Sequence, residues 1–183
     1  MDKKIIFIDS EISLRNHKID DLGAIKENGD IFHSPDIRSF ATFIQEGNFL
    51  CGHNIVHHDL KYIAEHIAVD SFASIDTLYL SPLLFPKKPY HRLVKDDKLQ
   101  SDELNNPLND AIKARDLFYE EIEAFQGLPN ILKRIFCALL YIQQVCPHGW
   151  KTLRMRCCIF LKLARLYWRA DFLSHITAWR SLV

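Results

Sequence analysis

Long hydrophobic runs are absent from this sequence: polar residues interrupt every apolar stretch before it reaches the roughly 18 residues that a membrane-spanning helix needs. No signal peptide is expected from its first residues, and the five cysteines are odd in number and form no CxxC pair. We therefore expect a reduced, cytoplasmic protein with neither a disulfide framework nor a membrane partner. The sequence also lacks a GxxxxGK(S/T) phosphate loop, which excludes a motor of that type, and it has no internal repeat or low-complexity segment.

Size and composition favour a single domain with a hydrophobic core. The chain has 183 residues, of which 48% are hydrophobic, and we expect it to fold without disulfides. The formal net charge is zero, but residues 1–150 carry a net charge of minus six, while residues 151–183 hold seven Lys or Arg against one Asp. An acidic domain binds a polyanion only if metal ions supply positive charge. The charge distribution therefore favours a metal-dependent site over a simple nucleic-acid-binding patch.

Two segments are predicted: residues 1–145 form the folded domain, and residues 146–183 form a basic tail that contains Trp and Cys. Two interpretations of the tail stay open. In the first, it contains a basic amphipathic helix around Leu161–Leu173 that docks on the core or on nucleic acid. In the second, it belongs to no evolved domain, as a truncation or a shifted reading frame would produce.

The order of the predicted elements favours an α/β fold. Short apolar runs predict strands at residues 3–9, 19–26, 31–33, 49–51 and 74–76, and caps with amphipathic spacing predict helices that begin at Asp36, at His58 or Asp59, at Pro107 and at Asn130. Pro82, Pro86 and Pro89 predict an irregular connection, and Asn105 or Asn106 would cap the helix at Pro107. This order matches a ribonuclease-H-like mixed five-stranded sheet. In such a sheet three antiparallel strands are extended by parallel strands, and helices flank the faces.

The most informative features of the chain are three acidic clusters, at Asp9–Glu11, His53–Asp59 and Asn109–Ala111. Side chains two apart in a strand point to the same side, so Asp9 and Glu11 would converge at the end of the first strand. Asp59 and Asp110 would approach from the first turns of two helices. Four carboxylates suffice to hold two Mg²⁺ or Mn²⁺ ions about 4 Å apart, an arrangement that activates water and stabilises the leaving oxygen in phosphodiester hydrolysis.

Each of these acids also has an ordinary structural explanation. Asp9 and Glu11 could end a strand in solvent, and Asp59 and Asp110 could stabilise the positive ends of helix dipoles. Two converging acids directly after an apolar run are unfavourable without a cation, which favours metal binding. Asp116 is an alternative to Asp110, but it lies about 240° further round the same helix, so only one of the two can face the site. We predict that Asp110 is the ligand.

The segments Phe7–Glu11, Gly52–Leu60 and Leu108–Ala111 resemble the three motifs of the DEDD superfamily of 3′-to-5′ exonucleases, in the right order over roughly residues 4–126. The resemblance implies a ribonuclease-H-like fold and a two-metal enzyme that releases nucleoside 5′-monophosphates from a nucleic-acid 3′ end. The catalytic metal ligands that it implies are Asp9, Glu11, Asp59 and Asp110. The candidate substrate-binding residues are Ser10, His53, Asn54 and Asn105. His53 and Asn54 alternatively close the strand-to-helix turn by local hydrogen bonding.

More narrowly, residues 76–82 and 98–110 are similar to the exonuclease module at the amino terminus of some bacterial RecQ-like helicase polypeptides. That similarity implies a RecQ-like helicase as a candidate partner. Single-stranded DNA is the favoured substrate, and RNA is the alternative. Two rival interpretations stay open, an oligoribonuclease-like enzyme and a non-catalytic nucleic-acid-binding module that keeps the same fold.

The chain departs from the superfamily pattern at the general base. One branch of the superfamily has a His five positions before the last Asp, and another has a Tyr four positions before it, whereas this chain has Asn105 and Asn106 there. Asn orients water but does not accept its proton near neutral pH. The base is therefore unknown, and three alternatives stay open. Another histidine substitutes, with His57, His58 and His91 as the candidates, the metal-bound water ionises without a base, or the activity is weak.

A basic stretch precedes the last motif. Its cations at Lys87–Lys88 and His91–Lys95 either contact the phosphate backbone or form a solvated loop. Tyr90 or Phe85 either stacks against a terminal base or packs against apolar side chains.

Overall fold

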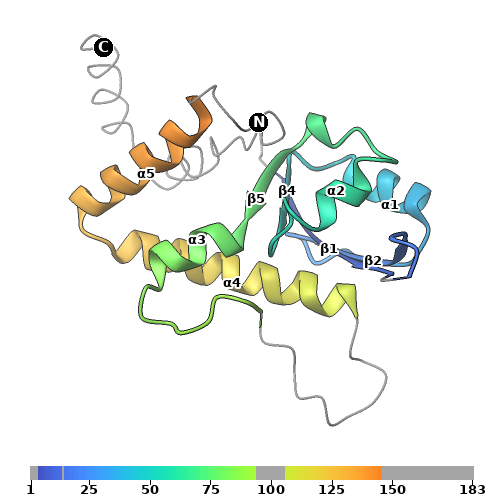
Figure 1. Cartoon of the computed structure of the whole chain (residues 1–183), viewed down its shortest axis with the longest axis horizontal. Helices are drawn as coiled ribbons and strands as arrows, with labels where there is room; N and C mark the ends of the chain where they lie inside the picture. The colour runs from blue at the N-terminus through green and yellow to red at the C-terminus, as the bar shows by residue number, and fades with distance from the viewer. Residues whose placement is uncertain (1–3, 14, 94–105, 146–183) are drawn as a thin grey trace. The chain divides into compact units, whose positions relative to one another are not determined.

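A computed structural model describes residues 4–13, 15–93 and 106–145, with side chains described as far as Cys137. The chain divides into two compact units, Met1–Pro129 and Asn130–Val183. Figure 1 shows the sheet and helices α1 to α4 in the first unit and α5 at the start of the second. The predicted tail at residues 146–183 lies outside the described residues.

The first unit is built on a mixed sheet of five strands in the order β3-β2-β1-β4-β5. The strands are β1 (Ile5–Ile12), β2 (Ile19–Lys26), β3 (Ile31–His33), β4 (Phe49–Gly52) and β5 (Ala73–Asp76). β2 pairs antiparallel with β1 and β3, whereas β1, β4 and β5 are mutually parallel. The predicted α/β class and the mixed five-stranded sheet are confirmed. Because β1, β4 and β5 run in one direction, their carboxyl ends meet at the same edge of the sheet.

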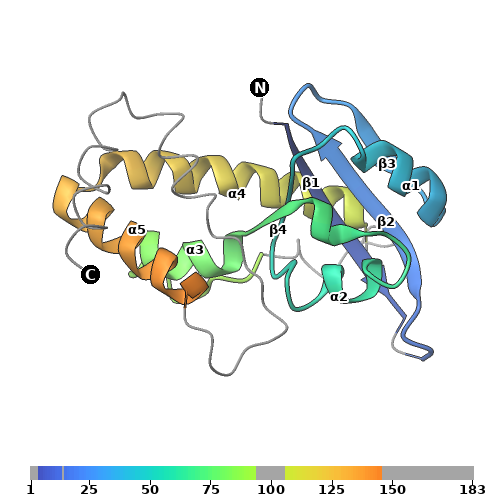
Figure 2. The same cartoon turned by 90° about the horizontal axis from the view of Figure 1, so that it is seen from above.

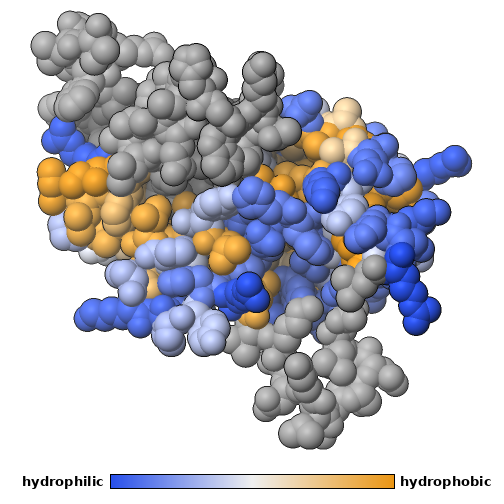
Figure 3. All heavy atoms as spheres, in the orientation of Figure 1, coloured by the Kyte–Doolittle hydropathy of each residue, from blue (hydrophilic) through white to orange (hydrophobic). Residues whose placement is uncertain are grey.

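Helices flank the sheet on both faces (Figure 2). On one face, α1 (Ile37–Ile44) and α2 (Asp59–Ile63) pack on alternate side chains of the strands. The buried residues of this core are Ile6, Ile8, Leu22, Ala24, Phe40, Ile44, Leu50, Ile55 and Ile63. Full burial of each large side chain in such a core contributes about 1.5–3 kcal/mol, so this face anchors β1 and β4 firmly. Outside this core, hydrophilic residues predominate over α1 and α2 on the face drawn in Figure 3.

The long helix α4 (Pro107–Gly127) covers the opposite face of the sheet and contacts β1 and β2 most extensively. The rings of Phe7 and Phe118 are both buried, and their centroids lie 5.6 Å apart. Ala111 and Ala114 are also buried, and their small side chains let the first turns of α4 approach the strands closely. β1 and α4 are therefore held in contact.

Local capping explains where two helices begin. The Asp36 carboxylate accepts from the backbone N–H groups of Arg38 and Ser39, as its position before the predicted helix indicated. Asn106 caps α4, and Pro107 occupies the first turn, as predicted. β1 continues to Ile12, three residues past its predicted end, because its antiparallel pairing with β2 extends beyond the apolar run.

The predicted irregular connection after β5 is wrong in its first half. Residues Thr77–Leu84 form the helix α3, which contains Pro82. Asp76 caps this helix by accepting from the backbone N–H of Leu78, and α3 packs against α4. Burial of one face of α3 outweighs the hydrogen bond that the proline removes, an effect that a proline-based rule misses.

α5 (Asn130–Val145) begins at the predicted residue. Its first turns expose Ile131, Leu132 and Ile135, and Figure 3 shows hydrophobic atoms on this helix. Among the described residues, no helix combines the length and the apolar character needed to cross a membrane.

Candidate metal centre

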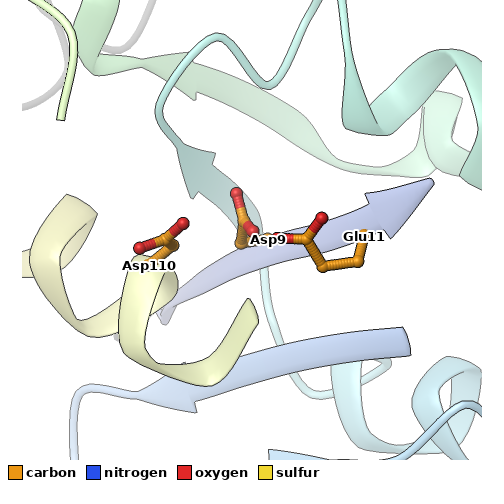
Figure 4. A group of neighbouring side chains, drawn as sticks. All are labelled: Asp9, Glu11 and Asp110. Carbon is orange, nitrogen blue, oxygen red and sulfur yellow. The ribbon is translucent and has the colours of Figure 1, made fainter. Parts of the chain in front are cut away.

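Three carboxyl groups from β1 and the first turn of α4 lie together (Figure 4). One oxygen from each of Asp9, Glu11 and Asp110 lies within 4.8 Å of the others, and all three side chains are partly buried. Asp9 and Glu11 share a face of the sheet because they are two residues apart in a strand. The structure thus brings together three of the four predicted ligands, two from the strand and one from the helix. We call this group the three-carboxylate site.

The start of α4 gives Asp110 its position. The side-chain oxygen of Asn106 accepts from the backbone N–H groups of Leu108 and Asn109, at 3.0 and 3.3 Å. The helix therefore begins sharply, and Asp110 falls in its first turn, where the helix dipole stabilises an acid. Lys113 lies one turn later, and its ammonium nitrogen is 3.8 Å from an oxygen of Asp110. That ammonium group partly balances the negative charge of the three-carboxylate site.

Gly23 in β2 allows α4 to reach the site. It lies opposite Asp9 in the β1–β2 ladder. A Cβ atom at this position would lie 2.1 Å from the backbone nitrogen of Leu108 and 2.2 Å from the carbonyl carbon of Pro107. The helix backbone therefore rests directly on the glycine, and this close approach sets the distance between Asp110 and β1.

Replacing Gly23 by alanine is expected to displace the start of α4. Because the new methyl group would overlap backbone atoms, the helix must shift, and we expect a loss of about 1–3 kcal/mol in the free energy of unfolding. Mn²⁺ affinity should fall as Asp110 moves away. Urea unfolding and Mn²⁺ titration followed by electron paramagnetic resonance measure the two effects. Gly127→Ala is the matched control, since its added Cβ would meet no described atom within 4 Å beyond its chain neighbours and the backbone of its own helix. Wild-type stability and affinity in Gly23→Ala would show that the close approach is not needed.

Asp59, the fourth predicted ligand, is held by β1 itself. It is the first residue of α2 and is 1% exposed. Its Oδ1 accepts from the backbone N–H of Ser10 at 2.7 Å and from the Ser10 hydroxyl at 2.6 Å. Its Oδ2 is buried and has no hydrogen-bond partner in the described part of the chain. Asp59 therefore lies beside β1 between the positions of Asp9 and Glu11, although it is not one of the three clustered carboxylates.

Ser10 was a candidate substrate-binding residue, and its surroundings give it a different role. Its side chain is 2% exposed, and its hydroxyl donates to Asp59. Strand alternation turns it away from the face that carries Asp9 and Glu11. The observed contacts make Ser10 an anchor for Asp59 and leave its hydroxyl inaccessible to a substrate.

The turn between β4 and α2 is organised by Asp76, which the sequence reasoning did not single out as a site residue. The Asp76 carboxylate is almost fully buried and accepts from the backbone N–H groups of Asn54 at 2.9 Å and Val56 at 3.2 Å, in addition to that of Leu78. Asn54 adopts a positive φ of 63°, a conformation that Asn tolerates. His58 donates its backbone N–H to the Asn54 carbonyl. Local hydrogen bonding thus closes this turn, as one of the two predictions for Asn54 stated.

His53 lies at the end of β4, and its ring is partly buried. Its Nδ1 lies 2.8 Å from the hydroxyl oxygen of Thr77, at the start of α3. Its Nε2 is buried and has no hydrogen-bond partner in the described part of the chain. Burial lowers the pKa of His53, while the nearby carboxylates of Asp110 and Asp59 and the backbone of His91 partly offset that effect. His53 is therefore neutral at pH 7 and lies within electrostatic range of the three-carboxylate site.

Several other predicted residues do not join the site. Asn105 lies outside the described residues, so its role in substrate binding stays a prediction. Asp116 is 59% exposed, and its carboxylate is bound by Arg115 at 2.8 and 2.9 Å, so α4 directs Asp110 and not Asp116 toward β1. The ammonium of Lys88, from the basic stretch, lies 3.7 Å from the carboxylate of Glu120.

The donor set suits a hard divalent cation. All three groups are carboxylates, and oxygen ligands are those that Mg²⁺ and Mn²⁺ prefer. Carboxylates this close repel one another, and a cation between them removes that cost. The unpartnered Oδ2 of Asp59 offers one more oxygen beside the same strand. The residues present therefore fit the predicted Mg²⁺ or Mn²⁺ cofactor.

Comparison of the chain with protein-family models, with curated proteins and with solved structures finds no match.

Three residues that shape the site were missed by reasoning from the sequence. A glycine inside a strand, such as Gly23, is a signal for close approach of another backbone. Asp76 ends the short strand β5 and directly precedes α3, which is a capping signal that Pro82 obscured. Thr77 carries no comparable signal, because its contact with His53 depends on the arrangement of β4 and β5.

Proposed function

We propose that this chain is a metal-dependent 3′-to-5′ exonuclease with a ribonuclease-H-like fold, and that it hydrolyses phosphodiester bonds at nucleic-acid 3′ ends. The observation that carries the proposal is the convergence of Asp9, Glu11 and Asp110 from the central strand and the last helix of the first unit. The order and direction of the five strands, with three antiparallel strands extended by two parallel ones, support the same fold. The 3′-to-5′ direction of the reaction is inferred from the resemblance to the DEDD motifs. Single-stranded DNA is the proposed substrate in preference to RNA.

Each residue of the site has a proposed role. Asp9, Glu11 and Asp110 hold the cations, with Asp59 as the fourth carboxylate. Bound cations of this type activate the attacking water and stabilise the leaving oxygen. Ser10 orients Asp59 through two hydrogen bonds. The turn after β4 and the start of α3 border the same edge of the sheet, and we assign the 3′-terminal nucleotide to the space beside them.

A second candidate function is a non-catalytic nucleic-acid-binding or helicase-associated module that retains the exonuclease fold. The observation that favours it is Asn105 in the place of the expected histidine, since an amide is no proton acceptor. The two functions differ in a simple assay. Both predict metal-dependent binding of nucleic acid, but only the first predicts product.

The proposed activity is tested with 5′-labelled single-stranded DNA and RNA in Mg²⁺, in Mn²⁺ and in a chelator. We expect products that shorten stepwise from the 3′ end, release of nucleoside 5′-monophosphates, faster loss of DNA than of RNA, and no reaction in the chelator. Circular single-stranded DNA, which has no 3′ end, should stay intact. Oligonucleotide binding with no product in either metal would favour the binding module. Cleavage of the circle would contradict an exonuclease.

A further inference from the structure

A buried polar cluster lies next to the three-carboxylate site, on the face of α3 that holds Thr77 and Ser81. These two residues are four apart and share one side of the helix, and both are 2% exposed or less. The Thr77 hydroxyl oxygen lies 2.8 Å from Nδ1 of His53, and the Ser81 hydroxyl oxygen lies 3.0 Å from Nδ1 of His91. Two imidazole rings are thus fixed by two hydroxyl groups of one helix.

The histidine pair lies within range of the carboxylates. The ring and the backbone of His91 act electrostatically on His53, and the carboxylates of Asp110 and Asp59 act on the same ring. Figure 1 shows the segment that follows α3 turning back toward the sheet. His91, which follows α3, therefore lies beside the ring of His53, on which the carboxylate of Asp110 also acts.

The other described histidines of this region make contacts, or are buried, in a way that does not suit proton transfer from water. The Nε2 atom of His57 contacts the Tyr79 hydroxyl. His58 adjoins Asp59, with its Nδ1 3.6 Å from an oxygen of that carboxylate. The remaining nitrogen of His53 is buried, so water does not reach it. His91 is only partly buried, and the contact with Ser81 uses its Nδ1 alone.

We propose that His91, oriented by Ser81, accepts the proton of the attacking water in place of the histidine that is missing at position 105. The inference rests on the proposed function. With its Nδ1–H donating to the Ser81 oxygen, the neutral ring carries its lone pair on Nε2. A base whose other nitrogen is held by a fixed partner is the arrangement that general-base catalysis requires.

The step is balanced as follows. The water oxygen forms a bond to the phosphorus of the terminal nucleotide, and the bond between that phosphorus and the 3′ oxygen of the preceding nucleotide breaks. One proton of the water passes to Nε2 of His91, and the leaving 3′ oxygen takes a proton from solvent. The charged side chains that act on the His53 member of the pair are the carboxylates of Asp110 on α4 and of Asp59 at the start of α2.

The test compares His91→Gln with His66→Gln, a matched change of an exposed histidine that follows α2 and lies outside the proposed site. Single-turnover hydrolysis of single-stranded DNA is measured from pH 5 to 9. We expect His91→Gln to lower the rate by about 10²- to 10⁴-fold, the usual contribution of a general base, and to remove the acidic limb of the profile. His66→Gln should keep the wild-type rate and the acidic limb. Mn²⁺ affinity should be unchanged in both variants, and added imidazole should partly restore His91→Gly.

A second measurement does not use activity. Diethyl pyrocarbonate modifies accessible imidazoles, and mass spectrometry locates each modified histidine in the wild-type protein in the presence of Mg²⁺. We expect thymidine 5′-monophosphate to slow modification of His91 and to leave that of His66 unchanged. Ser81→Ala serves as a milder variant if His91→Gln does not fold, and it should shift the acidic limb while lowering the rate less.

The outcomes separate the inference from the proposed function. If the wild-type protein cleaves and His91→Gln keeps its rate and pH profile, the role of His91 is overturned and the proposed exonuclease activity stands. If only Ser81→Ala folds, the same result in that variant leads to the same conclusion. A loss seen in His53→Gln instead would assign the base to His53. Unprotected His91 in the modification experiment would also overturn the inference. A wild-type protein that cleaves nothing would overturn both.

Discussion

Asp9→Asn is expected to abolish metal-dependent hydrolysis. Asp9 contributes one of the three clustered oxygens, and asparagine keeps the size of the side chain while it removes the negative charge that binds a cation. Losing one preorganised electrostatic group lowers an enzymatic rate by about 10²- to 10³-fold, and the loss of a bound cation adds to that. We therefore expect a decrease of about 10³-fold or more in the rate, together with weaker Mn²⁺ binding.

Asp116→Asn is the matched control for this experiment. Asp116 is on the same helix as Asp110, but its carboxylate is exposed and bound to Arg115. We expect this variant to retain the wild-type rate and Mn²⁺ affinity. Initial rates on single-stranded DNA and Mn²⁺ titration by electron paramagnetic resonance measure both properties. An Asp9→Asn protein that cleaves at the wild-type rate would show that the three-carboxylate site is not the catalytic centre.

Glu121→Gln is expected to change the pH dependence of stability strongly. Glu121 is 1% exposed, and both of its carboxyl oxygens are buried without a hydrogen-bond partner in the described part of the chain. Burial, reinforced by the negative charge of Asp76, raises the pKa of Glu121 to about 9, whereas its ordinary value is 4.5. The folded protein therefore holds a neutral carboxylic acid in its interior at pH 7.

The sign of the effect follows from the two pKa values. Below pH 4.5 both the folded and the unfolded chain carry the proton, so Glu121 adds no pH dependence. Between pH 4.5 and about 9 only the folded chain retains it, and the free energy of unfolding falls by about 1.4 kcal/mol for each pH unit. Glutamine never ionises. Relative to wild type, Glu121→Gln should therefore be stabilised by about 3 kcal/mol at pH 7 and by almost nothing at pH 4.

Urea unfolding at pH 4, 7 and 8 measures this difference. Glu120→Gln is the matched control, because the neighbouring Glu120 side chain is 62% exposed and should show little dependence on pH. A difference between Glu121→Gln and wild type that stays constant from pH 4 to pH 8 would mean that the buried carboxyl ionises normally. It would also contradict the burial that raises the pKa.

Much of the fold follows from local patterns in the chain. The apolar run that begins at Ile5 predicts a central strand, Asp36 and Asn106 predict two helix starts, and the Asn28–Gly29 pair predicts the turn between β2 and β3, where Gly29 has a φ of 94°. These signals act within a few residues, so they can be read without knowledge of the rest of the molecule. α3 is the exception, because Pro82 gives a local signal against a helix and burial against α4 reverses it.

The amino-acid sequence by itself determined which acids are available and that Asp9 and Glu11 share one face, since strand alternation is a property of the backbone. Only the tertiary structure decided how they are used. The hydrogen bonds from Ser10 hold Asp59 across 49 positions of sequence, and the contact of Gly23 with the start of α4 sets the place of Asp110. Such contacts depend on how closely two distant backbones pack, and no local pattern encodes that distance.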